Sequence, residues 1–167
     1  MRLPLSSANF EAMASIRIID IAYALQRRVW RLFRPRTRGV KVMVFNAAGE
    51  LALIRNSYGR SDLFVLPGGG VRPFEEPARA AARESREELG LQVSELKFRS
   101  RHSSEAEGKR DEIYLFEARV GGPPEVDRFE LEEARFVSLH KLPATTSPAT
   151  RRRVDEFLGL RAPDGNW

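Results

Sequence analysis

Three glutamates between residues 84 and 88 are the side chains of this sequence that are best placed for chemistry. Glu84, Glu87 and Glu88 are separated by steps of three and four, which places them on one arc of an α-helix. Like charges at this spacing repel, so the arc needs a compensating cation. Arg83 lies four residues before Glu87 and supplies one positive charge. The remaining carboxylates suit a hard divalent cation, because Mg²⁺ prefers oxygen ligands. The competing interpretation is a solvated helix face, which the helix taken alone favours.

The helix that carries these acids is predicted from Pro77 to Leu89. Pro77 suits the first helical position, and Gly90 suits the left-handed residue that follows the last turn. A run of three glycines after Pro67 lets the backbone approach the helix closely, so a carbonyl of this turn is a further candidate ligand. A stripe of small and aliphatic residues is predicted to pack against a sheet: Ala78, Ala81, Ala82, Ser85 and Leu89.

The rest of the chain predicts a mixed sheet around this helix. A hairpin is expected from strands at 40–45 and 51–54, followed by strands at 64–66, 95–101, 113–120 and 135–139. Ser147 and Pro148 predict the start of a last helix, which Gly159 ends. The expected fold class is α+β, an α/β/α sandwich with a mixed sheet flanked by the acidic helix and the C-terminal helix.

The first 38 residues form a separate region, a loose tail followed by an amphipathic helix at 16–34. Its arginines gather on one arc, and Trp30 lies on the broad apolar face. We expect this helix to pack on the domain or on a second copy in a homodimer; peripheral contact with an anionic membrane is the less favoured alternative. The main domain is expected at 39–160, and residues 161–167 are expected to form a C-terminal tail.

Composition excludes several classes of protein. The 167-residue chain has no cysteine, which rules out disulfide scaffolds, zinc–thiolate sites and thiol catalysis. A net charge of +5 favours anionic partners. The sequence has no recognisable RNA-binding motif, so we do not expect nucleic acid as a partner. No apolar run approaches the ~18 residues of a membrane span and no signal peptide is evident, so the expected location is cytoplasmic.

The spacing of residues from Gly69 to Leu91 resembles the signature of the Nudix hydrolase family. Seven identities match: Gly69, Glu75, Arg83, Glu84, Glu87, Glu88 and Gly90. At about 7% usage per residue, seven chance matches have a probability of ~10⁻⁸ per starting position. The order of elements from Gly39 to Gly159 also fits the family. Ser85 departs from the usual aliphatic residue, and we expect its hydroxyl to bond to a helical carbonyl.

The resemblance implies a hydrolase that cleaves a nucleoside diphosphate linked to another moiety, with Mg²⁺ or Mn²⁺ as cofactor. The implied metal ligands are Gly69, Glu84, Glu87 and Glu88. Glu84 or another acid would orient the attacking water, and Arg83 would hold Glu87 in position. Glu75 and Gly90 would have structural roles. The alternative is a non-catalytic Nudix-fold module that binds nucleotides or has a regulatory role, but such members commonly lose signature acids that this sequence keeps.

A further acid from a later loop often completes the site in this family. Glu130 is the predicted residue, with Asp111 and Glu112 as rivals. Arg55 is a candidate phosphate contact, and Tyr58 and Phe64 are candidates for stacking on a base. The sequence does not separate the substrates known for the family, because marks associated with particular subfamilies are missing.

Overall fold

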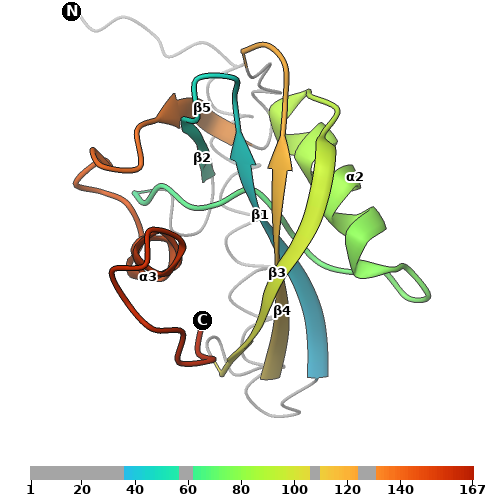
Figure 1. The fold of residues 1–167 in the computed structure, drawn as a ribbon. Helices are drawn as coiled ribbons and strands as arrows, with labels where there is room; N and C mark the ends of the chain where they lie inside the picture. Colours follow the sequence, from blue (N-terminus) through green and yellow to red (C-terminus); the bar gives the residue numbers. More distant parts are fainter. Residues whose placement is uncertain (1–35, 57–61, 106–109, 124–130) are drawn as a thin grey trace, which may run out of the picture.

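The computed structural model describes residues 36–56, 62–105, 110–123 and 131–167 (Figure 1). The predicted helix at 16–34, Tyr58 and Glu130 lie outside these residues. In chain order the elements are β1 (Arg36–Phe45), β2 (Leu51–Asn56), α2 (Pro77–Leu89), β3 (Ser94–Ser104), β4 (Arg110–Arg119), β5 (Leu131–Val137) and α3 (Pro148–Phe157).

The described strands form one five-stranded mixed sheet in the order β3-β4-β1-β2-β5. Its centre is the parallel pair β1 and β4, which runs in continuous register from Arg36 opposite Arg110 to Phe45 opposite Arg119. The other neighbours are antiparallel. The predicted hairpin is confirmed, with a turn after β1 in which the Asn46 amide donates to the Glu50 carbonyl at 3.1 Å. The central strand β1 therefore lies next to both β2 and β4.

The two helices cover opposite faces of this sheet (Figure 1), which confirms the predicted sandwich. On one face, valines of β1 at positions 40, 42 and 44 pack with Ala80, Ala81 and Leu89 of α2. On the other face, Met43 and Phe45 pack with Val154 of α3. The alternation of side chains along β1 thus supplies both cores from one strand.

Helix α2 has the predicted bounds. Gly90 adopts the left-handed conformation at φ 68°, and its amide donates to the Arg86 carbonyl at 3.0 Å. The Ser85 hydroxyl is buried and donates to the Ala81 carbonyl at 2.8 Å, as expected for a serine on the packed face. Both hydrogen bonds lie within the helix and its C-terminal cap.

Some elements differ from the predicted ranges. Strand β1 begins at Arg36 rather than residue 40, because the polar segment ahead of Val40 pairs with β4. Residues 64–66 form isolated bridges to Ile54 and Thr146 instead of a continuous strand. Strand β5 covers Leu131–Val137, earlier than the predicted 135–139. No helix in the described part of the chain is both long and apolar enough to cross a membrane.

The C-terminal residues pair with the edge of the sheet. The Ser103 amide of β3 donates to the Gly165 carbonyl, and the Trp167 amide donates back to the Ser103 carbonyl, each at 2.9 Å. Behind this pairing, the fully buried Arg153 donates to His102 Nδ1 and to the Asn166 carbonyl, both at 2.7 Å. Residues 165–167 are therefore bound to β3 and α3.

Candidate active site

Arg83 is the centre of the acidic cluster on α2. Its Nε and Nη2 donate to the two carboxylate oxygens of Glu75 at 2.9 Å, and its Nη1 donates to Glu84 at 2.6 Å and to Glu87 at 3.0 Å. Nη2 also donates to the Gly70 carbonyl at 3.0 Å. Only 12% of the Arg83 side chain is exposed. One guanidinium therefore offsets the repulsion among three carboxylates and ties the helix to the loop before it.

These contacts shift the proton affinities of both partners. The hydrogen bonds from Arg83, followed by the one from the Arg72 amide, lower the pKa of Glu75 to about 2. The hydrogen bonds from the carboxylates, that of Glu75 above all, raise the pKa of Arg83. Both groups are thus charged at neutral pH. Glu75 joins the loop before α2 to the helix through Arg83.

The glycine turn contacts the remaining signature acids directly. The Gly68 amide donates to Glu88 Oε2 at 2.6 Å. The Glu84 carboxylate lies against Gly69, so close that a Cβ on that residue would stand 2.6 Å from Oε2. Gly68 itself has φ 131°, and a Cβ there would stand 2.2 Å from the Val40 carbonyl oxygen. Gly68 is therefore required by its close approach to the backbone of β1, whereas at Gly69 the neighbour is the flexible end of the Glu84 side chain.

The donor set fits a hard divalent cation in kind. Carboxylate oxygens from α2 and carbonyl oxygens from the turn are the ligands that Mg²⁺ and Mn²⁺ accept. Within the described ranges, no three acidic or histidine side chains converge on one point. Glu84 and Glu87 are held by Arg83, and Glu88 is held by the Gly68 amide. Gathering them around one cation therefore requires rotation of side chains.

A cleft of about 620 Å³ opens beside the signature turn. Its walls come from the first half of β1, the turn after Gly68 and the start of β4. Four basic residues line it together with Gly69, Gly70 and Asp111: Arg36, Arg38, Lys41 and Arg72. A positively charged cleft next to carboxylates can hold a phosphorylated molecule. Sequence reasoning missed these basic residues, because their grouping depends on the pairing of β1 with β4.

The other predicted site residues are distributed unevenly around this cleft. Asp111 lines it and accepts a hydrogen bond from the Thr37 hydroxyl. Glu112 instead pairs with Arg101 at 3.0 Å and accepts from the Tyr114 hydroxyl at 2.6 Å. Of the two rival acids, Asp111 rather than Glu112 lies beside the signature turn.

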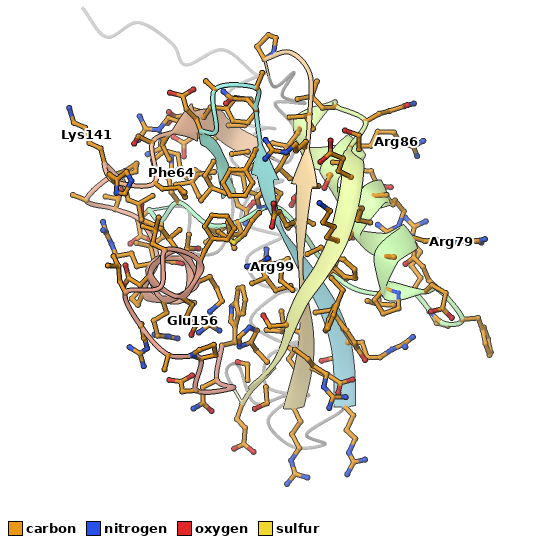
Figure 2. The ribbon with its side chains drawn as sticks, in the orientation of Figure 1. Phe64, Arg79, Arg86, Arg99, Lys141 and Glu156 are labelled. Atoms are coloured by element: carbon orange, nitrogen blue, oxygen red, sulfur yellow. The ribbon has the colours of Figure 1, made fainter. Side chains whose placement is uncertain are left out.

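Arg55 and Phe64 lie together near the junction of β2 and β5. The Phe64 ring is 2% exposed, with the guanidinium carbons of Arg55 and Arg135 at 5.4 and 4.3 Å from its centroid. Arg55 also pairs with Glu132 and Glu133 at 3.4 and 3.1 Å. The structure therefore places Phe64 in the core and Arg55 in an ion-pair cluster. Figure 2 shows Phe64 on the side of the sheet away from Arg79 and Arg86 of α2.

Comparison with known proteins gives consistent matches. The model of the NUDIX domain matches residues 35–157. An uncharacterized Nudix hydrolase of Pseudomonas aeruginosa is 35% identical over 107 residues, which cover 60% of this chain and 62% of that protein, less than two thirds of its length. An RNA pyrophosphohydrolase of Rhizobium meliloti is 28% identical, with 71% of this chain and 89% of that protein covered.

The fold comparison agrees. The crystal structure of a MutT NUDIX hydrolase from Burkholderia pseudomallei superposes with a TM-score of 0.65 at 25% identity. The match covers 72% of this chain and 96% of that one. The matched segment in each comparison is large enough to contain a whole domain.

Proposed function

Because the chain belongs to the Nudix hydrolase family, we propose that it is a metal-dependent pyrophosphohydrolase that cleaves a nucleoside diphosphate linked to another moiety. The observation that carries this proposal is the joint placement of the signature residues. One loop and one helix bring Glu75, Glu84 and Glu87 onto a single guanidinium, that of Arg83. The proposed reaction is attack of water on a phosphorus of the pyrophosphate.

The chain's own residues divide the work between two regions. The carboxylates of α2 and the Gly69 carbonyl would hold Mg²⁺ or Mn²⁺. When bound, such a cation would polarise a phosphoryl oxygen and lower the pKa of a bound water. Glu84 or another acid would orient or deprotonate the attacking water; the contact of Glu84 with Gly69 of the turn supports this role.

The basic cleft would bind the phosphates of the substrate. Arg36 and Arg38 come from β1 and Arg72 comes from the signature loop, so their positive charges lie in the cleft beside the turn. Guanidinium groups bind phosphate oxygens in bidentate fashion, which would orient the pyrophosphate toward the carboxylates. Asp111 lines the same cleft and would assist the carboxylates of α2. Glu130, the acid predicted from the sequence, lies outside the described residues.

A substrate screen tests this function. Nucleoside diphosphate derivatives, nucleoside triphosphates and 5′-triphosphorylated RNA are each incubated with the protein in Mg²⁺, Mn²⁺ or EDTA, and phosphate is measured after phosphatase coupling. Glu87→Gln runs beside the unmodified chain. Glu76→Gln is the matched control, since Glu76 is an exposed glutamate at the start of α2 whose side chain caps no amide.

Turnover that requires metal, survives in Glu76→Gln and is lost in Glu87→Gln supports the proposal and identifies the substrate class. Turnover that is equal in all three proteins would contradict it. Tight nucleotide binding without turnover on any compound would support the alternative, a binding or regulatory module on the same fold.

A further inference from the structure

Strand β1 holds the signature turn through four consecutive carbonyls. The Pro67 and Gly69 carbonyls accept from the Val42 and Val40 amides, each at 2.9 Å. The other two carbonyls, those of Leu66 and Gly68, accept hydrogen bonds from the Lys41 side chain. Their oxygens lie 2.9 and 2.6 Å from Lys41 Nζ. Two of these four carbonyl contacts therefore depend on one ammonium group, while the Val71 amide adds a further bond to the Arg38 carbonyl of β1.

The pattern of these contacts explains why a lysine is suited to this position. The backbone amides of β1 reach only the Pro67 and Gly69 carbonyls. The ammonium group carries three donors on a flexible stem and can bridge the two that remain. Leu66 is fully buried, and a buried carbonyl without a partner is costly.

Two signature acids rest on the segment that Lys41 holds. Glu88 accepts from the Gly68 amide, and Glu84 packs against Gly69. The peptide between these two glycines has no side chain on either side to limit its rotation. Its carbonyl oxygen belongs to Gly68 and is the one that Lys41 binds at 2.6 Å.

We propose that Lys41 is a positioning residue for the reaction: its ammonium group fixes the Gly68–Gly69 peptide and so sets the place of the Glu84 carboxylate, which packs against Gly69. The proposal has two parts. Its effect on catalysis rests on the proposed function, whereas the effect of Lys41 on the structure of the turn does not. Lys41 also lines the basic cleft, so a direct role in binding substrate phosphate is the competing explanation.

The structural half is tested without metal or substrate. Lys41→Met removes the ammonium group and keeps a side chain of similar length, and Lys41→Arg keeps the charge. Lys141→Met is the control, because Lys141 is exposed and far from this turn (Figure 2). Hydrogen exchange of the Gly68 and Gly69 amides is measured by NMR, with thermal unfolding in parallel. If Lys41→Met does not fold, Lys41→Gln replaces it, since its shorter amide can still bond one carbonyl.

In Lys41→Met, the amide hydrogens of Gly68 and Gly69 should exchange roughly tenfold faster or more. This acceleration should exceed any change at core amides, such as those of β1. Lys41→Arg should restore much of the protection. Unchanged exchange at both glycines, or acceleration only in proportion to global destabilisation, would overturn the proposal. Neither result depends on whether a substrate has been found.

The catalytic half uses the substrate from the screen. A positioning role predicts that Lys41→Met lowers kcat by about ten- to a hundredfold with KM changed little, because a displaced Glu84 carboxylate acts on the chemical step. A raised KM with unchanged kcat would overturn it in favour of direct phosphate binding. If the unmodified chain turns over no substrate, the proposed function fails. The hydrogen-exchange measurement still tests whether Lys41 holds the turn.

Discussion

Arg83 donates to both carboxylate oxygens of Glu75, from Nε to Oε1 and from Nη2 to Oε2, each at 2.9 Å. This bidentate pair joins the middle of α2 to the loop that leads into it. The same loop is closed by the Arg72 amide, which donates to Glu75 Oε2 at 2.9 Å. Arg83 then has Nη1 left for Glu84 and Glu87, so the position of the acids depends on the Glu75 pair.

Replacing Glu75 by Gln should change the response of the fold to acid. In the folded protein the pKa of Glu75 is about 2, below its ordinary value of 4.5, chiefly because of the hydrogen bonds from Arg83. The unfolded chain therefore binds a proton first as pH falls. The stabilisation from this pair is complete above about pH 4.5 and is lost between there and about pH 2.

Urea unfolding at several pH values in that range measures the effect. The unmodified chain should lose stability more steeply with falling pH than Glu75→Gln does. Parallel curves for the two proteins would show that the pair makes no net contribution. At neutral pH, Glu75→Gln should also lower turnover by roughly ten- to a hundredfold, as expected for a residue that orients the groups at a metal site.

Gly69→Ala should impair activity much more than stability. The new Cβ would stand 2.6–2.7 Å from the Glu84 carboxylate, and the flexible end of that side chain can move away at small cost to the fold. Gly70→Ala is the matched control, because nothing lies within 4 Å of a Cβ there. Turnover rate and the free energy of unfolding are measured for both variants. Equal turnover in the two variants would show that the packing of Glu84 on Gly69 is unimportant.

Phe74→Gly should stabilise the protein. Phe74 has φ 63° in the loop between Gly70 and Glu75, and its side chain is fully exposed. A left-handed conformation costs a non-glycine residue roughly 1–2 kcal/mol. Glycine also increases the entropy of the unfolded chain, which costs about 0.5–1 kcal/mol of stability. The net gain in the free energy of unfolding is therefore about 0–1.5 kcal/mol. Denaturant unfolding measures it, and a clear loss of stability would show that the ring makes contacts that the fold needs.

His102 should make stability fall as pH drops from about 6.5 toward 4. Burial, followed by the charge of Arg153, lowers the pKa of this histidine to about 4 from 6.5. Arginine only donates, so His102 Nδ1 accepts from it and the neutral ring is the form that the fold holds. The unfolded chain takes up the proton first, which weakens the fold through this range. In His102→Asn this pH dependence should disappear; its persistence in the variant would assign it to other groups.

The sequence predicts α2 well, because its signals are local. Pro77 and Gly90 fix its ends, and Ala81, Ser85 and Leu89 of the predicted packed stripe are buried. The stripe was wrong at Ala78, which is exposed, and it missed the buried Ala80. The range of β1 was harder to predict, since the strand begins at Arg36 only through its pairing with Arg110 of β4. Hydrophobic periodicity carries no information about such a parallel partner.

The same distinction applies to the site. Spacing along one helix identifies Glu84, Glu87 and their partner Arg83, but the bidentate bond to Glu75 requires the loop to fold back. Lys41 lies in an apolar strand and carries no recognisable signal, because its role depends on a turn that passes beside β1. Phe64 has a suitable side chain for stacking on a base, yet its burial depends on α3 and β5.

Titration of the metal-free protein with Mn²⁺, followed by electron paramagnetic resonance and combined with turnover of the same samples, tests the central claim most directly. Glu84→Gln, Glu87→Gln and Glu88→Gln are compared with the unmodified chain and with Glu76→Gln. The account predicts that the unmodified chain and Glu76→Gln bind Mn²⁺ and hydrolyse a nucleoside diphosphate derivative. The three signature variants should lose roughly tenfold or more in affinity and most of the turnover. Native affinity and native turnover in all three signature variants would contradict it.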